Sequence, residues 1–355
     1  APNRRARQVN SVTPGNGSRL SALAFGLGYH ARTLAELIPN RQAKSVLAFP
    51  NMPRLSLGAR LAWGALVVNL VTILGGALVS ATGSGAGCGE SWPSCKGAVL
   101  PGLSSFTTQI EFSHRITSGL ALISVVVLFV SVYRNYAKGT QARRAVNLCA
   151  LAIVVESLLG AWLVLARLVE DNATVMRAIA VPIHLVNTLF LIAALTSCAW
   201  ILSHRTPLRW PKAGRKKLWL AAGGLVLLGM TGGIAALADT LFPVESLGEG
   251  IRADLDTTAH FLTRLRIVHP MLAIGVGAFL LHVAGSAYDI ARPHAIALMV
   301  LVGAQVGLGI LNVLLLTPIP MQLMHLLLAD LLWISVLLLA AEMGRVSEPG
   351  RARAA

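Results

Sequence analysis

The chain has 355 residues, of which 55% are hydrophobic and only 13% are charged, whereas soluble domains carry about 25% charged residues. This composition excludes an ordinary soluble domain and indicates a protein with several membrane-spanning segments. The formal net charge of +15 does not indicate nucleic-acid binding, because the basic residues collect between apolar stretches and no nucleic-acid-binding motif accompanies them.

Residues 1–53 differ from the rest of the chain. They are rich in arginine and contain no apolar run long enough to cross a membrane. One interpretation is a natural basic tail or targeting segment. The other, which we favour, is an over-extended gene start with Met52 as the true initiator. Under either interpretation we expect this segment to be poorly ordered.

Eight apolar runs follow, each close to the roughly 20 residues that a helix needs to cross a bilayer. We therefore predict an all-α membrane protein with eight transmembrane helices. The predicted spans are 61–82, 111–133, 146–166, 178–200, 218–238, 265–287, 294–315 and 322–343.

Basic residues mark alternate connections between these spans. They are Arg134, Lys138, Arg143 and Arg144 after the second span, Arg205, Arg209, Lys212, Arg215, Lys216 and Lys217 after the fourth, and Arg345, Arg351 and Arg353 in the tail. Because basic loops stay on the cytoplasmic side, both termini are predicted to be cytoplasmic. The loops 83–110 and 239–264 then lie outside.

The two halves of the chain resemble each other. The matching motifs are Gly75-Gly76 and Gly232-Gly233, Glu156…Gly160 and Gln305…Gly309, and His184-Leu185 and His325-Leu326. Such a parallel repeat predicts two pseudo-symmetric four-helix bundles. We place them at 54–203 and 218–343, joined by a cytoplasmic linker at 204–217 and followed by a tail at 344–355.

One histidine lies near the start of every even-numbered span. These residues are His114, His184, His269 and His325. All four spans run from outside to inside, so the histidines lie at similar depth. Two histidines in one bundle can ligate a heme iron, which predicts the pairs His114 with His184 and His269 with His325. A lone histidine could instead bond a neighbouring helix. Copper or zinc is disfavoured, because no Cys or Met accompanies these histidines in a ligand-like pattern.

The two halves also differ. Glu111 stands three residues before His114, on the same helical face, whereas Arg266 stands three residues before His269. An acid inside an apolar span indicates a functional site and can handle protons or place water. An arginine there suits a heme propionate. The alternative for Glu111 is an ion pair with Arg115, four residues later.

Four cysteines divide into two kinds. Cys149 and Cys198 lie within apolar spans and are interpreted as packing residues. Cys88 and Cys95 lie in the outer loop, where cysteines so placed usually form a disulfide. That disulfide could clamp the loop over the first bundle, or it could exchange with a thiol donor during turnover.

Several of these motifs resemble those of the heme A synthase family. They are Gly83-Ser84-Gly85-Ala86-Gly87-Cys88, Trp92-Pro93-Ser94-Cys95, Glu111-Phe112-Ser113-His114-Arg115, His184-Leu185, His269, and the run from His325 to Trp333. The resemblance covers residues 55–343. It implies eight helices in two similar bundles, and the loop cysteines match a bacterial subgroup with a disulfide there. Pro270 departs from the pattern, since Arg would be expected by symmetry with Arg115.

The resemblance implies an enzyme that oxidises the C8 methyl of heme O, through an alcohol, to the formyl group of heme A. It implies that His114 and His184 bind the substrate heme O, that Glu111 acts in catalysis, and that His269 and His325 hold a heme b cofactor. Propionate contacts are expected from Arg115, Arg177 and Arg266.

The same resemblance implies a multi-pass protein of the plasma membrane, surrounded by lipid. Its expected partners are heme O synthase and assembly factors of a terminal oxidase, and no nucleic acid; the sequence does not indicate the electron acceptor. Two rival functions stay open. One is a bis-histidine diheme b-type electron-transfer protein, which leaves Glu111 unexplained. The other is a transporter or heme permease, which would hold no heme tightly.

Overall fold

The computed structural model describes residues 55–99, 101–102, 105–205 and 207–346. The chain divides into two units, residues 1–54 and 55–355, and the fold described below is that of the second unit. The predictions for the basic segment 1–53 and for most of the tail 344–355 lie outside the described residues.

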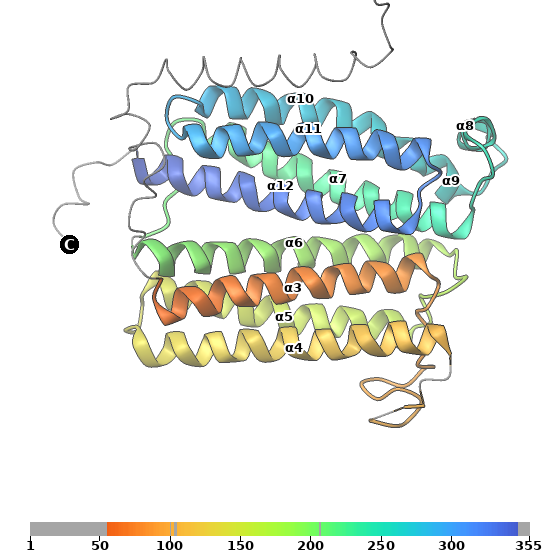
Figure 1. The fold of residues 1–355 in the computed structure, drawn as a ribbon, viewed down its shortest axis with the longest axis horizontal. Helices are drawn as coiled ribbons and strands as arrows, with labels where there is room; N and C mark the ends of the chain where they lie inside the picture. Colours follow the sequence, from red (N-terminus) through yellow and green to blue (C-terminus); the bar gives the residue numbers. More distant parts are fainter. Residues whose placement is uncertain (1–54, 100, 103–104, 206, 347–355) are drawn as a thin grey trace, which may run out of the picture. The chain divides into compact units, whose positions relative to one another are not determined.

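All regular elements in the described ranges are helices, and eight spans are long and apolar enough to cross a membrane (Figure 1). They are α3 (Leu57–Ala81), α4 (Phe106–Asn135), α5 (Gln141–Leu165), α6 (Val175–His204), α7 (Arg215–Leu241), α9 with α10 (Phe261–Arg266 and Val268–Ala287), α11 (Arg292–Leu314) and α12 (Ile319–Val346). This confirms the all-α membrane fold. Most helices extend a few residues past the predicted runs, because polar flanking residues continue the helix after the apolar composition ends.

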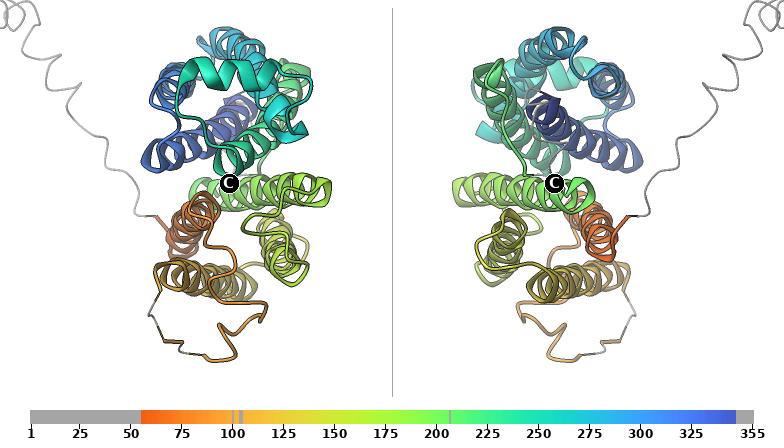
Figure 2. Two further views of the ribbon diagram at one scale, coloured as in Figure 1. Left: turned by 90° about the vertical axis from the view of Figure 1, so that its right-hand side faces the viewer. Right: turned by 90° about the vertical axis from the view of Figure 1, so that its left-hand side faces the viewer.

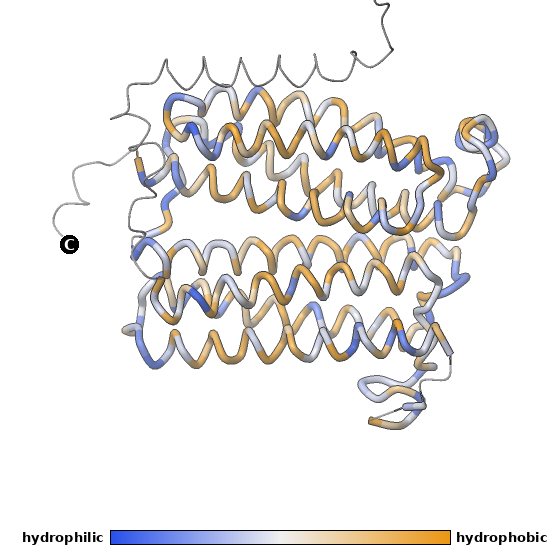
Figure 3. The backbone as a smooth tube through the Cα atoms, viewed as in Figure 1, coloured by the Kyte–Doolittle hydropathy of each residue, from blue (hydrophilic) through white to orange (hydrophobic). Residues whose placement is uncertain are grey.

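Apolar and hydrophilic residues occupy different parts of the helices. Figure 3 shows apolar residues along the helices and hydrophilic residues at their ends. One end carries residues 82–99 and the disulfide, and we call it the disulfide end. The other end carries the connections 136–140 and 207–214 and is called the basic end. Both names describe the structure alone, without assigning a side of the membrane.

The helices form two rings of four. In the first ring the neighbours are α3 with α4, α4 with α5, α5 with α6, and α6 with α3. In the second ring they are α7 with α10, α10 with α11, α11 with α12, and α12 with α7. The end-on views of Figure 2 show these rings as two separate groups. Each histidine-bearing pair of helices is therefore diagonal within its ring, and that the rings are related by a symmetry axis stays a prediction.

Helices α3 and α6 of the first ring contact α7 and α12 of the second. Trp333 of α12 fixes this contact, because its Nε1–H donates to the carbonyl of Leu189 at 2.8 Å. Trp333 is itself buried, so the indole contributes apolar area and one satisfied polar group to the boundary between the rings.

A small apolar cluster of Ala178, Leu237, Ala238 and Leu262 lies toward the disulfide end, and the main packed core lies in the basic half of each ring. In the first ring it begins with Ala121 on α4 and Leu189 on α6, and in the second with Leu280 on α10 and Leu332 on α12. The histidines precede these positions on their helices, so they lie toward the disulfide end, beyond the packed core.

The sixth span is broken rather than continuous. Helix α9 ends at Arg266, α10 begins at Val268, and Ile267 lies between them. Pro270 explains the break, because proline lacks an N–H and its ring clashes with the carbonyl four residues earlier, at Arg266. A further short helix, α8 (Leu247–Leu255), lies in the loop before it. The sequence analysis did not predict α8.

Candidate functional site

Each of the four histidines lies against a glycine of the preceding spanning helix. The pairs are His114 with Gly76, His184 with Gly160, His269 with Gly232, and His325 with Gly309. A Cβ at Gly76, Gly232 or Gly309 would approach its histidine Cε1 to 3.0 Å, and one at Gly160 to 4.0 Å. Three of the four imidazoles thus occupy space that any larger residue would fill.

The second ring brings His269 and His325 together. Their imidazole centroids lie 6.3 Å apart and the imidazole planes are nearly perpendicular, at 84°. A metal-bound imidazole nitrogen lies about 2 Å from its metal, so two imidazoles on opposite faces of one iron have centroids about 6 Å apart. The separation therefore fits bis-histidine ligation. One contact has to give way, because Gln305 Nε2 lies 3.2 Å from His325 Nε2.

The first ring carries His114 and His184 on its diagonal helices α4 and α6. That these two imidazoles face each other across the bundle stays a prediction. A groove of about 340 Å³ opens between α3 and α4 beside His114. It is lined by Val71, Gly75 and Leu78 of α3 and by Ile110, His114 and Thr117 of α4. His114 is therefore reachable from the side of the bundle.

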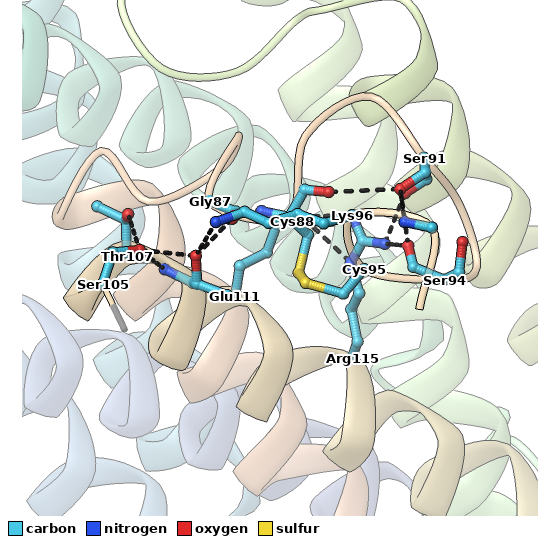
Figure 4. Close-up of a disulfide and its surroundings, with 12 residues drawn as sticks. Gly87, Cys88, Ser91, Ser94, Cys95, Lys96, Ser105, Thr107, Glu111 and Arg115 are labelled. Atoms are coloured by element: carbon cyan, nitrogen blue, oxygen red, sulfur yellow. Dashed lines mark hydrogen bonds and ion pairs between the residues drawn. A yellow bond between two sulfur atoms is a disulfide. The ribbon is translucent and has the colours of Figure 1, made fainter. Parts of the chain in front are cut away.

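Glu111 is buried at the start of α4 and held on both carboxylate oxygens (Figure 4). Oε2 accepts a hydrogen bond from the backbone N–H of Cys88 at 2.7 Å. Oε1 accepts from Arg115, from Nη2 at 2.5 Å and from Nε at 3.1 Å. The ion pair that the sequence offered as an alternative is therefore present. It also connects the acid to the outer loop.

Arg115 ties the loop to α4. Its Nη1 donates to the carbonyl of Ser91 at 2.7 Å and to that of Ser94 at 2.5 Å. Cys88 and Cys95 form the predicted disulfide, and both are buried. The loop between them is thus closed by a covalent bond and bound to the helix by one guanidinium (Figure 4).

The other two arginines proposed for propionates are engaged as well. Arg177 is buried and donates from Nη1 to the carbonyls of Glu170 and Asn172, which closes the loop before α6. Arg266 pairs with Asp239 at 2.9 Å and with Asp254 at 2.6 Å. Each of these arginines would have to exchange a present partner for a propionate, and that role stays a prediction.

Two polar residues of the odd-numbered spans were missed as site residues. Glu156 of α5 lies beside His184, with Oε2 3.8 Å from Nδ1, and Gln305 of α11 lies beside His325. They occupy matching positions of the repeat. The signal available for Glu156 was an ionisable residue inside an apolar span, which marks a functional site by default. The signal for Gln305 was its matching place in the repeat.

The chain matches the sequence model of a family described as cytochrome oxidase assembly protein (COX15-CtaA) over residues 59–337. A protoheme IX farnesyltransferase of Thermus thermophilus is 44% identical over 298 residues, which are 81% of this chain and 48% of that protein. Heme A synthases of Bacillus mycoides and Bacillus cereus are 42% and 41% identical over 102 residues, which are 28% of this chain and 33% of theirs.

This chain thus spans about half the length of the Thermus relative, so the printed activity of that protein is not transferred to it. The family match carries more weight, because it runs through all eight spans from α3 to α12 and includes the four histidines, Glu111 and the disulfide loop. The chain belongs to the cytochrome oxidase assembly protein (COX15-CtaA) family.

Proposed function

We propose that this protein is a heme A synthase, an oxidoreductase that converts the C8 methyl of heme O to the formyl group of heme A. The family match and the Bacillus heme A synthases support this proposal. The observation that carries it is Glu111, a buried carboxylate one helical turn from His114. A protein that only transfers electrons between two hemes would need this carboxylate only for its ion pair with Arg115 and its hydrogen bond from the loop.

The substrate heme O is assigned to the first ring. His114 and His184 orient it from diagonal helices, and the groove between α3 and α4 gives access to His114 from the side. Oxidation of the methyl by water to an alcohol, and of the alcohol to a formyl group, each removes two electrons, which pass to an external electron acceptor, and releases two protons. We assign Glu111, at the disulfide end of the same helix, to accepting a proton or holding that water.

A heme b is assigned to the second ring, held by His269 and His325. The supporting observations are the 6.3 Å between their imidazole centroids and the glycines against which both imidazoles lie. A heme bound there would supply electron transfer. The acid of the first ring has no counterpart here, because the position of Glu111 is taken by Arg266, which is neutralised by Asp239 and Asp254.

We assign the protein to the plasma membrane with both termini cytoplasmic, because the basic end then lies inside. The expected partners are the enzyme that farnesylates protoheme IX, which supplies the substrate, and the assembly factors of a terminal oxidase. The name of the Thermus relative supports the first of these, since half of that protein matches this chain.

The test is expression in a host that makes heme O, followed by heme extraction and chromatography. Wild type should accumulate heme A, and Glu111→Gln should lose that product while still binding heme b. The matched control is Glu90→Gln, which neutralises an exposed acid of the disulfide loop that precedes α4. If Glu111→Gln makes as much heme A as wild type, the assignment of Glu111 fails. If wild type makes none, a diheme electron-transfer protein is favoured.

A further inference from the structure

The carboxylate of Glu156 on α5 accepts hydrogen bonds from one face of α6. Its Oε2 accepts a hydrogen bond from Asn187 Nδ2 at 2.6 Å, and its Oε1 accepts a short hydrogen bond from Thr188 Oγ1. The same carboxylate lies 3.8 Å from Nδ1 of His184. The three α6 residues stand at positions i, i+3 and i+4, so they share one helical face. The side chain of Glu156 is 18% exposed, so this acid lies within the helix packing rather than on open surface.

The histidine side of this contact is incomplete. Nδ1 of His184 is buried and makes no hydrogen bond to any described residue. A separation of 3.8 Å is longer than a hydrogen bond, but a small rotation of the imidazole or the carboxylate closes it. Gly160 faces Cε1 of the imidazole and leaves room for that rotation. An unsatisfied buried nitrogen beside a fixed carboxylate therefore has its partner in place.

The second ring differs at each equivalent position. Gln305 replaces the acid, and the residues three and four after His325 are Leu328 and Ala329, which offer no side-chain donor. Oε1 of Gln305 is correspondingly buried without a hydrogen bond to any described residue. In the first ring, two side-chain donors of α6 thus bond Glu156. In the second ring, the equivalent positions of α12 offer no side-chain donor to Gln305.

This matching explains why an acid is tolerated in the first ring. A carboxylate within a membrane-spanning helix is expensive, and it is kept where specific partners bind it. Asn187 and Thr188 provide two hydrogen bonds on opposite oxygens, which offset part of the cost of removing the carboxylate from water. Packing alone would be satisfied by an apolar residue at position 156. Asn187 and Thr188 would then keep only their bonds to the backbone carbonyls of Ala152 and His184.

We propose that Glu156 is a positioning residue that accepts the Nδ1 proton of His184. The hydrogen bond fixes the tautomer of His184, so that Nε2 carries the free lone pair and faces the iron of the substrate heme. This inference rests on the proposed function of the first ring. A carboxylate bonded to a ligand histidine also raises the basicity of that ligand, which Gln305 cannot do for His325. The two heme sites of this chain are therefore tuned differently.

The first test requires no bound heme. The full chain, labelled with ¹⁵N-histidine and solubilised, is compared with Glu156→Gln by NMR, and His184→Ala identifies the signal of His184. We expect the Nδ1–H tautomer in wild type and its loss in Glu156→Gln. The matched control is Ser157→Ala, because within the described ranges the Ser157 hydroxyl bonds the carbonyl of Ile153 on its own helix. An unchanged tautomer in Glu156→Gln overturns the proposal.

The second test uses ferric protoheme as the probe, titrated into protein whose second ring already holds heme. We expect Glu156→Gln to bind it about 10–100-fold more weakly, as for other residues that orient a metal ligand. The midpoint potential of that heme should become more positive, while Ser157→Ala should match wild type. A lower activity without a change in affinity or potential would mean a structural role only, and the proposal would be withdrawn.

One further variant keeps the tests decisive. Thr188→Val removes one of the two hydrogen bonds to the carboxylate of Glu156, so it should shift the tautomer of His184 and the heme potential in the same direction as Glu156→Gln. It serves in place of Glu156→Gln if that variant does not fold. If wild type binds no second heme, the proposed function of the first ring fails, whereas the tautomer of His184 still tests the contact with Glu156.

Discussion

The backbone N–H of Cys88 donates a hydrogen bond to Oε2 of Glu111 at 2.7 Å, so the disulfide loop directly holds the buried acid of α4. A cysteine of the disulfide and a buried carboxylate of helix α4 are thus joined by a direct hydrogen bond. The loop does more than cover the first ring, because its backbone completes the surroundings of Glu111.

The double variant Cys88→Ser/Cys95→Ser should reduce heme A formation several-fold while leaving heme b bound. Without the disulfide, the backbone that presents the N–H of Cys88 is less constrained. In chain-entropy terms, a disulfide that closes a loop of this size stabilises the folded state by about 2–3 kcal/mol. Heme extraction measures both quantities. A disulfide that only clamps the loop leaves residual activity, whereas one that exchanges in every turnover leaves none.

Reduction of wild type provides the control for this variant. A mild reductant should bring wild-type activity to the level of the double variant and should not alter the double variant itself. Full activity in the absence of the disulfide would show that Glu111 keeps its position without the loop.

Arg115→Leu should lower the thermal stability of the solubilised protein, and Glu111→Gln should recover part of that loss in the double variant. Removing the guanidinium leaves a buried carboxylate without its cation, which costs about 3–5 kcal/mol in comparable cases. The coupling is read from a double-mutant cycle of unfolding midpoints. Arg134→Leu, on an exposed position of the same helix, is the control. Strictly additive effects of the two substitutions would contradict this interpretation.

The eight spans and the disulfide could be predicted because they depend on composition and on short sequence separations. Helix α8 was also predictable in retrospect. Ser246 caps it by accepting from the N–H of Glu249, and Ser and Glu three residues apart are the capping-box pattern. The break at Ile267 follows from Pro270 and could have been predicted in the same way.

Partners that come from distant elements could not be predicted. Asp239 and Asp254 neutralise Arg266 from α7 and α8, and nothing in the local sequence of Arg266 indicates them. The contact of Glu156 with His184 likewise depends on how α5 and α6 pack. The repeat showed that both residues occupy special positions, but only the arrangement of the helices shows that they are neighbours.

Gly232→Ala should reduce the affinity of the second ring for heme b about 10–100-fold. Mutating a residue that orients a metal ligand, as Gly232 does for His269, has effects of that order. The added Cβ would lie 3.0 Å from Cε1 of His269 and would push the imidazole out of place. Gly223→Ala on the same helix is the matched control, since a Cβ there meets no described atom within 4 Å. Pyridine hemochrome spectra quantify the heme. Equal heme contents in the two variants would show that the glycine contact does not position His269.

His269→Ala and His325→Ala should each abolish the low-spin b-type spectrum of the protein as purified, because one imidazole cannot complete bis-histidine ligation. His114→Ala and His184→Ala should leave that spectrum unchanged and lower heme A formation instead, since those residues belong to the other ring. His282→Ala, on the same helix as His269 but bonded to Lys217 toward the basic end, controls for the loss of any histidine. Low-spin heme persisting in His325→Ala, with its electron paramagnetic resonance signal intact, would mean that another residue ligates the iron, and the 6.3 Å approach of the two imidazoles would then need a different explanation.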